Sequence, residues 1–321
     1  MNIKKITALL CAVVMVLSLA ACGSNGDKAS DSKHYTIGIC QLVQHEALDA
    51  ATKGFRDAIT DALGAENVTF DEQNAAGDSA TCATICNGFV SSGVDLILAN
   101  ATGALQAAAA ATKDIPILGT AVTEYGVALG IDNFGGTVGG NISGTSDLAP
   151  LDQQAAMITE LFPDAKNVGI IYCSGEPNSV YQVEVVKAAL EKAGCTVNPY
   201  TFSDTNDVVS VTSTASDAND VLYIPTDNTA ASCAEAIKSA AKKPIIAGEE
   251  GICKGCGVAT LSIDYYELGR TTGEMAVKIL KGEADISTMA IEYYPNPVKK
   301  YNAEMATAYN VTIPSDYEAI G

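Results

Sequence analysis

A repeated pattern of strand, polar turn and helix constrains the fold of this chain more than any other feature. Residues 94–100 read VDLILAN and residues 221–228 read VLYIPTDN, and each apolar run stops at polar residues that favour a turn. An Ala-rich helical pattern follows both runs, and a second short apolar run then begins after Pro116 or Pro244. An internal repeat of this size indicates two similar α/β units.

The repeat extends toward the N-terminus and predicts parallel sheets. Residues 37–40 (IGIC) open one copy and residues 168–173 (VGIIYC) open the other. Strands that alternate with helices form parallel sheets covered on both faces, and ligands bind beyond the C-terminal strand ends. We therefore expect two facing lobes around one cleft. Its predicted lining is residues 99–103, 118–122, 224–228 and 247–251.

The spacing of apolar residues predicts the remaining elements. Residues 131–144 hold five glycines without a helical or strand period, so we expect a loop there that leads to the crossover between lobes. They are not a dinucleotide fingerprint, because no G-x-G-x-x-G occurs. Helices are expected at 44–63, 78–91, 150–161, 178–193, 207–216, 229–241 and 264–280, and strands at 67–70, 257–263 and 291–294. Asp78 is the expected N-cap and Gly93 the expected end of one helix.

The N-terminal segment has the features of an export signal. Lys4 and Lys5 precede an apolar stretch at 6–19, which is shorter than the ~20 residues of a spanning helix. The following Leu-Ala-Ala-Cys22 resembles a bacterial lipobox and implies cleavage before Cys22 and lipid on its sulfur. An ordinary signal with a chance cysteine is the alternative. Residues 1–21 are thus predicted to be a lipoprotein signal peptide, and residues 22–33 a flexible tether.

Charge and motifs exclude several classes of function. Loss of the leader removes two lysines and no acid, so the formal net charge goes from −19 to −21, which disfavours nucleic acid and anionic lipid. The sequence has two histidines and no H-E-x-x-H, P-loop or G-x-S-x-G motif. We therefore expect no enzyme, no catalytic residues, no cofactor and no metal. An exported α/β enzyme with a nucleophilic Cys40 or Cys173 is the alternative.

The cysteines leave several interpretations open. Cys253 and Cys256 form a C-x-x-C, which could be a local disulfide, a thiol pair or inert; without a second such pair it is no zinc motif. Cys82 and Cys86 share a helix face and should pack as small apolar side chains. Cys40 and Cys173 end the first strand of each copy, which brings them toward the cleft.

The strand ends predict a site for a zwitterion. A helix that begins at 101–103 presents free N–H groups that suit a carboxylate, with residues 120–122 beside it. The other copy places acids at the matching positions, Asp227 and Glu249-Glu250, which suit an ammonium group. An α-amino acid would satisfy both. The alternative for Asp227 is a simple helix cap.

Several segments resemble the substrate-binding lipoproteins of ABC importers, in particular the tryptophan/tyrosine-type group. They are the lipobox and residues 38–55, 144–147, 178–184, 223–228 and 248–280. The resemblance implies an α/β type I periplasmic-binding-protein fold, with two Rossmann-like lobes of parallel strands joined by three crossover strands. It also implies a monomer, lipid-anchored on the extracytoplasmic face of the bacterial membrane. Such a protein captures an aromatic or other apolar amino acid and delivers it to an ABC permease with its ATPase.

The resemblance also implies the lobes and the ligand-binding residues. The first lobe is expected at 34–146 plus 264–284, and the second at 147–263 plus 285–321. Asp147 could instead serve the hinge alone, and Gly103 departs from the group, where a proline is common. The implied ligand-binding residues are Gln41, Gln44, Ala101, Thr102, Thr120, Thr145, Ser146, Asp147, Asn178, Ser179, Thr226, Asp227, Asn228 and Glu250. Rings that could cover the ligand are Tyr125, Phe134, Tyr181 and Tyr265. A receptor for a nucleoside, sugar or other small solute on the same fold is the alternative function.

Overall fold

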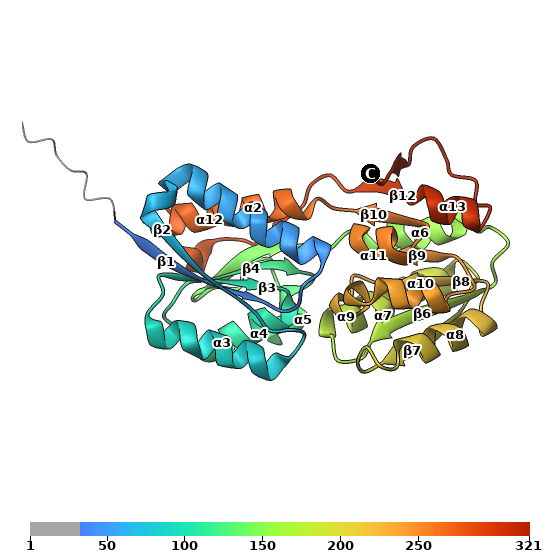
Figure 1. Ribbon diagram of the computed structural model, residues 1–321, viewed down its shortest axis with the longest axis horizontal. Helices are drawn as coiled ribbons and strands as arrows, with labels where there is room; N and C mark the ends of the chain where they lie inside the picture. The colour runs from blue at the N-terminus through green and yellow to red at the C-terminus, as the bar shows by residue number, and fades with distance from the viewer. Residues whose placement is uncertain (1–32) are drawn as a thin grey trace, which may run out of the picture. The chain divides into compact units, whose positions relative to one another are not determined.

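Two sheets of mostly parallel strands repeat one strand order in this computed structural model, which describes residues 33–321 (Figure 1). The strands are β1 (Tyr35–Gln41), β2 (Val68–Asn74), β3 (Leu96–Asn100), β4 (Ile117–Val122), β5 (Ile142–Ser146), β6 (Asn167–Cys173), β7 (Thr196–Phe202), β8 (Val221–Ile224), β9 (Ile245–Ala247), β10 (Ala259–Ser262), β11 (Glu292–Tyr293), β12 (Val298–Tyr301) and β13 (Glu318–Ala319). The first sheet runs β11-β5-β4-β3-β1-β2, and the second runs β13-β12-β10-β9-β8-β6-β7. The shared order β2-β1-β3-β4-β5 and β7-β6-β8-β9-β10 confirms the doubled α/β unit. The predicted signal peptide, tether and lipidation of Cys22 lie outside the described residues.

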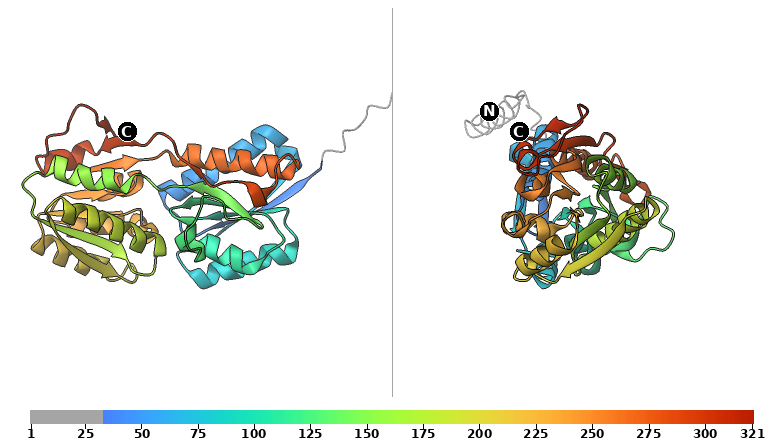
Figure 2. Two further views of the ribbon diagram at one scale, coloured as in Figure 1. Left: turned by 180° about the vertical axis from the view of Figure 1, so that it is seen from behind. Right: turned by 90° about the vertical axis from the view of Figure 1, so that its right-hand side faces the viewer.

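Helices cover both faces of each sheet. They are α2 (Glu46–Leu63), α3 (Ser79–Ser92), α4 (Thr102–Ala111), α5 (Tyr125–Leu129), α6 (Leu151–Leu161), α7 (Pro177–Lys192), α8 (Val208–Ala218), α9 (Asn228–Ser232), α10 (Ala234–Ala240), α11 (Glu250–Cys256), α12 (Tyr265–Leu280) and α13 (Ala303–Ala308). On the first sheet, α2 and α12 lie side by side on one face and α3 and α4 lie on the other (Figures 1 and 2). No helix of residues 33–321 is long and apolar enough to span a membrane.

Alternation along the strands builds two cores in the first lobe. Ile37 and Ile39 of β1 pack with Phe55 of α2 and Met275 of α12. Cys40 of β1 belongs to the other core, with residues of α3 and α4. Each face of a parallel sheet is thus apolar, because side chains alternate between two covered faces.

Small residues bring α2 and α12 into close contact. A Cβ added at Gly54 would overlap the carbonyl oxygen of Tyr266, and one added at Gly269 would overlap that of Ala51. Gly273 lies one turn further, and a Cβ added there would lie 2.7 Å from the Cβ of Ala58 and from the carbonyl oxygen of Phe55. The two backbones therefore approach where only glycine fits.

The chain passes between the sheets three times, as predicted. It leaves the first sheet after β5, returns after β10 to form α12 and β11, and leaves again to form β12. Because β11 pairs with β5, we propose that the final return to the second lobe follows Tyr293 rather than residue 284. The other predicted lobe boundaries stay predictions.

Two local predictions are wrong, and one helix was not predicted. Residues 229–241 form two short helices that meet at Cys233, whose backbone φ of −128° lies outside the helical range. The predicted loop at 131–144 ends early, since β5 begins at Ile142. Cys253 and Cys256 lie within α11, which the sequence patterns did not predict.

Candidate functional site

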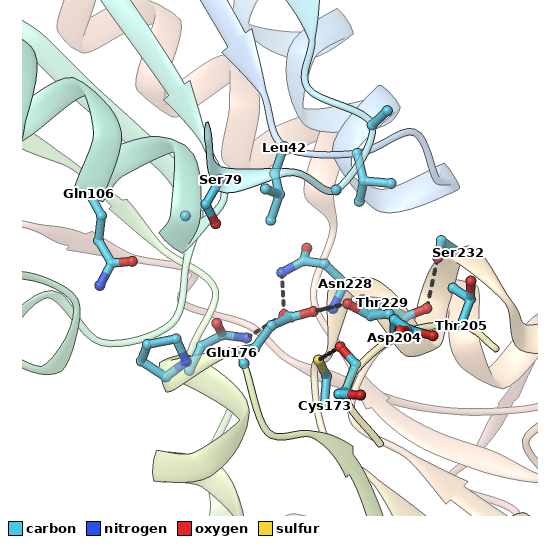
Figure 3. A pocket seen from close by; sticks show the side chains of 18 residues that line it. Leu42, Ser79, Gln106, Cys173, Glu176, Asp204, Thr205, Asn228, Thr229 and Ser232 are labelled. Atoms are coloured by element: carbon cyan, nitrogen blue, oxygen red, sulfur yellow. Dashed lines mark hydrogen bonds between the residues drawn. The ribbon is translucent and has the colours of Figure 1, made fainter. Parts of the chain in front are cut away.

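A cavity of about 340 Å³ lies between the two lobes, and we call it the interlobe cleft. The first lobe contributes Leu42 and Val43 after β1, Ala76, Gly77 and Ser79 at the start of α3, and Gly103 and Gln106 of α4. The second lobe contributes Cys173, Gly175, Glu176, Pro177, Asn178, Ser203, Asp204, Thr205, Asn228, Thr229 and Ser232 (Figure 3). Its charged lining residues are both acids, and none of its lining residues is basic or aromatic.

The start of α4 forms one wall of the interlobe cleft. Ala101 is buried at the N-cap position with φ 86° and ψ 161°, a conformation that is essentially restricted to glycine. Its side chain has no capping oxygen, and no side-chain cap of this helix occurs among residues 33–321. The N–H groups of the first turn, including that of Gly103 in the lining, therefore lack helical partners and carry the positive end of the helix dipole.

Glu176 dominates the opposite wall. It precedes α7 and is 8% exposed. One carboxylate oxygen accepts from the backbone N–H of Asn228 at 3.0 Å and from the side-chain amides of Asn228 at 2.8 Å and Asn178 at 3.2 Å. The other accepts from the N–H and hydroxyl of Thr229 at 2.8 and 2.7 Å. This carboxylate joins the starts of α7 and α9 at the cleft surface (Figure 3).

Asp227 lies beside Glu176 and is 1% exposed. One oxygen caps α9 by accepting from the N–H of Ala230 at 2.8 Å, and the other accepts from the N–H of Cys173 at 2.7 Å. Burial, with the charge of Glu176 as second cause, raises the pKa of Asp227 to about 8. Asp227 thus forms the helix cap that was the alternative to a binding role, and contact with a ligand stays a prediction.

Two contacts link the lobes at the cleft. Nε2 of His45, which precedes α2, lies 3.2 Å from Oδ1 of Asn228. Nearby, Nζ of Lys254 lies 2.8 Å from a carboxylate oxygen of Glu46, with both side chains about half exposed. Burial lowers the pKa of His45, and its Nδ1 has no partner among residues 33–321. Both contacts join residues of different lobes, so they form only in this arrangement of the lobes.

Five predicted ligand residues in the second lobe form one network around the cleft wall. Asn178 donates to the carbonyl of Thr226 at 3.1 Å as well as to Glu176. The Thr226 hydroxyl donates to Gly248, and Ser179 adds a hydrogen bond that lowers the pKa of Asp227. Within this network, Asn178 and Asn228 line the interlobe cleft.

Several predicted ligand residues of the first lobe are engaged within that lobe. Gln41 accepts from the hydroxyl of Thr52 and donates to Asp49. The buried hydroxyls of Thr120 and Thr145 lie within 3.3 Å of each other and bond to that of Thr272. Ser146 donates to the carbonyl of Thr123, and Thr102 opens α4 beside Ala101 without lining the cleft.

The remaining predicted residues lie nearer the crossovers or the rim. Asp147 accepts from the hydroxyl of Tyr265 at 3.0 Å, and burial raises its pKa. Its other oxygen is buried without a partner among residues 33–321. Glu250 accepts from Lys300 and from Ser262. Gln44 is exposed on a separate groove beside α9 and α11.

The four aromatic candidates do not line the interlobe cleft. Tyr125 is buried, donates to the carbonyl of Thr145 at 3.0 Å and stacks with Phe134 at 6.5 Å between ring centroids. Tyr181 of α7 packs against the core of the second lobe, and Tyr265 lines a smaller hollow near the crossovers. Each thus has a core or hinge contact in this structure.

Sequence reasoning missed Glu176. An acid directly before a proline, after the first strand of the second copy, occupies the N-cap position of a helix beside the cleft. That place in the repeat was the available signal. Glu249 was assigned to the cleft, but it is buried at the N-cap of α11, and burial raises its pKa to about 7.

Most cysteines among residues 33–321 are buried. The eight cysteines among residues 33–321 are free, and no cluster of metal-ligating side chains occurs there. Burial raises the pKa of Cys253 and Cys256, and the two pack in the core under α11. Cys173 lines the cleft as predicted, but burial raises its pKa. Cys40 lies in the core away from the cleft, contrary to the prediction.

Comparisons with known proteins agree with this architecture. The profile of the family described as ABC transporter substrate binding protein matches residues 36–316. The tyrosine-binding protein of Clostridioides difficile (strain R20291) is 40% identical over 295 residues, which cover 88% of this chain and 85% of that protein. A solved ABC domain in complex with L-Trp, from Streptococcus pneumonia, is 33% identical, covers 90% of this chain and 100% of its own, and has a TM-score of 0.85.

A second solved relative is similar to this chain in sequence but less similar in overall structure. The ligand-free, open structure of a substrate-binding protein with adhesive properties from Clostridium difficile is 38% identical and covers 89% of this chain and 99% of its own. Its TM-score is only 0.68, below that of the less identical L-Trp complex. This chain belongs to the ABC transporter substrate-binding proteins and has their type I periplasmic-binding-protein fold.

Proposed function

We propose that this protein captures a free α-amino acid with an aromatic or apolar side chain in the interlobe cleft and delivers it to an ABC permease with its ATPase. The observation that carries the proposal is the pairing of charges across the cleft. Uncapped N–H groups of α4 lie on one wall and the Glu176 carboxylate lies on the other. Relatives bind tyrosine and L-Trp, which supports an aromatic side chain.

The ligand carboxylate would meet the start of α4, where Gly103 leaves room for it. The ammonium group would lie near Glu176, which faces no basic residue of the cleft lining, with Asp227 buried behind that wall. Asn178 and Asn228 would orient the ligand by hydrogen bonds. Closure would remove these charges from water together, which strengthens each interaction.

Binding of free amino acids and of their blocked derivatives tests the proposal. Thermal unfolding of residues 23–321 is measured with L-Tyr, L-Trp, L-Phe and L-Leu, each beside its amide and its N-acetyl form. A free amino acid at ~100 times its dissociation constant should stabilise by about 2.7 kcal/mol. Both blocked forms should fail, because each removes one charge. Equal stabilisation by the blocked forms would contradict the zwitterion site.

A polyhydroxy solute, such as a sugar or nucleoside, is the second candidate. One property of the cleft favours such a solute: the lining is rich in hydroxyl and amide groups and contains no aromatic ring. The same unfolding assay with a panel of sugars and nucleosides decides between the two. A shift with one of these and none with amino acids would replace the amino acid as ligand.

We also propose that the mature protein is a monomer held at the extracytoplasmic membrane face by lipid on Cys22. Family members are extracytoplasmic receptors, and the proposal rests on the lipobox-like sequence before Cys22. Metabolic labelling with a radioactive fatty acid should mark the wild-type protein and not the Cys22→Ala variant. Equal labelling of the two would rule out this anchor.

A further inference from the structure

Three buried cysteines meet between β1 and α3, behind the wall of the interlobe cleft. Ile37 and Ile39 face α2 and α12, so the alternating residues Gly38 and Cys40 face α3 and α4. A Cβ at Gly38 would lie 2.6 Å from the ring of Phe89, which places this residue of α3 directly over Gly38.

The helix register then brings two more thiols over Cys40. Cys86 and Cys82 precede Phe89 by three and seven residues and lie on the same face of α3. In a β-α-β unit the helix runs antiparallel to its strands. Residues of α3 that precede Phe89 therefore lie closer to the C-terminal end of β1, where Cys40 is. Cys86 and Cys82 lie about 4.5 and 10.5 Å from Phe89 along the helix axis, and Cys40 lies about 6.6 Å from Gly38 along the strand. Cys40 is therefore expected at a level between the two α3 cysteines. All three cysteines are 0% exposed and belong to the same hydrophobic core cluster of the first lobe.

We propose that this cluster is a redox site, in which Cys40 forms a disulfide with Cys82 or Cys86 when the protein meets a low-molecular-weight disulfide. We assign the first attack to Cys82, which the reagent reaches when the first turn of α3 opens, because this side chain is 0% exposed in the folded protein. It lies in the first turn of α3, where the helix dipole favours a thiolate, and the hydrogen bond from Cys40 lowers its pKa. A thiolate is the reactive form in thiol–disulfide exchange.

The reaction balances without another reductant or oxidant. The Cys82 thiolate attacks one sulfur of the disulfide R–S–S–R, forms a mixed disulfide and releases one thiolate RS⁻. Cys40 then loses its proton to that thiolate, attacks the Cys82 sulfur and releases the second RS⁻. Two protein thiols become one disulfide, and one R–S–S–R becomes two R–SH after proton uptake. Cys86 is left as a thiol that can exchange with the new disulfide.

The link would join two segments that lead into the cleft. Cys40 is followed directly by Gln41 and then by Leu42 of the cleft lining, and α3 begins with Ser79 of the same lining. The other five cysteines among residues 33–321 lie in the second lobe, so a link between β1 and α3 within the first lobe must contain Cys40.

Peptide mapping tests the proposal. Folded residues 23–321 are incubated with glutathione disulfide, alkylated, digested with trypsin and analysed by mass spectrometry. Residues 34–53 contain Cys40, and residues 57–113 contain both α3 cysteines, so the predicted product is a link between these two peptides. The midpoint of thermal unfolding should rise, and dithiothreitol should reverse both changes.

Variants make the test specific. The link should be absent from the Cys40→Ala variant and should persist in Cys195→Ala, a control in the second lobe. If Cys40→Ala does not fold, the double replacement Cys82→Ala with Cys86→Ala removes the link in the same way, and each single replacement keeps it. Full alkylation of all three cysteines after oxidation, or links only among other cysteines, would overturn the proposal.

Discussion

Replacement of Glu176 by glutamine separates the structural role of this carboxylate from its proposed role in binding. Glutamine keeps the shape but presents one oxygen and one amino group. The carbonyl oxygen is best placed where three donors converge, so Asn178 and Asn228 keep their bonds as neutral ones. The amino group then faces the backbone N–H of Thr229, which loses its acceptor.

These changes determine the expected loss in the free energy of unfolding. An unsatisfied buried N–H costs about 1–3 kcal/mol, and hydrogen bonds to a charged group exceed neutral ones by about 1 kcal/mol each. Relief of the repulsion between Glu176 and Asp227 offsets part of this loss. We expect Glu176→Gln to lower the free energy of unfolding by about 3 kcal/mol. It should also weaken amino-acid binding, because the charge that faces the ammonium group is gone.

Urea unfolding and titration calorimetry measure the two effects. Glu184→Gln is the matched control, because this exposed acid lies on the same helix as Glu176 and away from the cleft lining. The control should change neither quantity. An unfolding free energy of Glu176→Gln equal to wild type would refute the hydrogen-bond argument. Unchanged affinity with reduced stability would leave the carboxylate a structural role and refute its part in binding.

Four further predictions use the same unfolding and binding assays. Ala101→Gly should raise the unfolding free energy, because relief of about 1–3 kcal/mol of backbone strain exceeds the entropic cost of glycine; a loss would refute the strain. Gly269→Ala should lower it by about 1–3 kcal/mol or more through overlap with α2, whereas the open position Gly88 should tolerate alanine. The pKa of Asp227 is raised from 3.8 to about 8, so its protonated form favours the folded state. Stability should therefore fall as pH rises from about 4 to about 8, and Asp227→Asn should flatten this slope. Lys254→Ala removes an exposed ion pair between the lobes, so ligand affinity should drop by less than about fivefold; a larger loss would give this pair a greater role in closure.

The repeat made the fold predictable from sequence, because each copy carries its own strand, turn and helix signals. Local signals also placed boundaries correctly. Asp78 caps α3 by accepting from the N–H of Thr81, and Gly93 ends it in the left-handed region at φ 69°. Both effects depend on residues within a few positions in the chain, so the sequence alone contains them.

Side-chain partners across the fold were less predictable. Glu176 and Thr229 are 53 residues apart, and their contact depends on how β6 and β8 bring two helix starts together. The break between α9 and α10 lies at Cys233, whose backbone N–H donates to the carbonyl of Ala230 rather than to that of Thr229. Apolar periodicity does not report such bonds, which is why one helix was predicted where two exist.

Unfavourable local features concentrate where the two lobes meet. Ala101 has a backbone conformation suited to glycine, Asp227 is a buried acid with a raised pKa, and buried atoms of His45 and Asp147 lack partners among residues 33–321. Each feature costs free energy in the folded protein. A zwitterion bound between the lobes would offset part of these costs. Its ammonium group would pair with an ionised carboxylate, so neither buried charge would lack a partner. Binding should then release protons from Asp227, so amino-acid affinity should increase as pH rises toward 8.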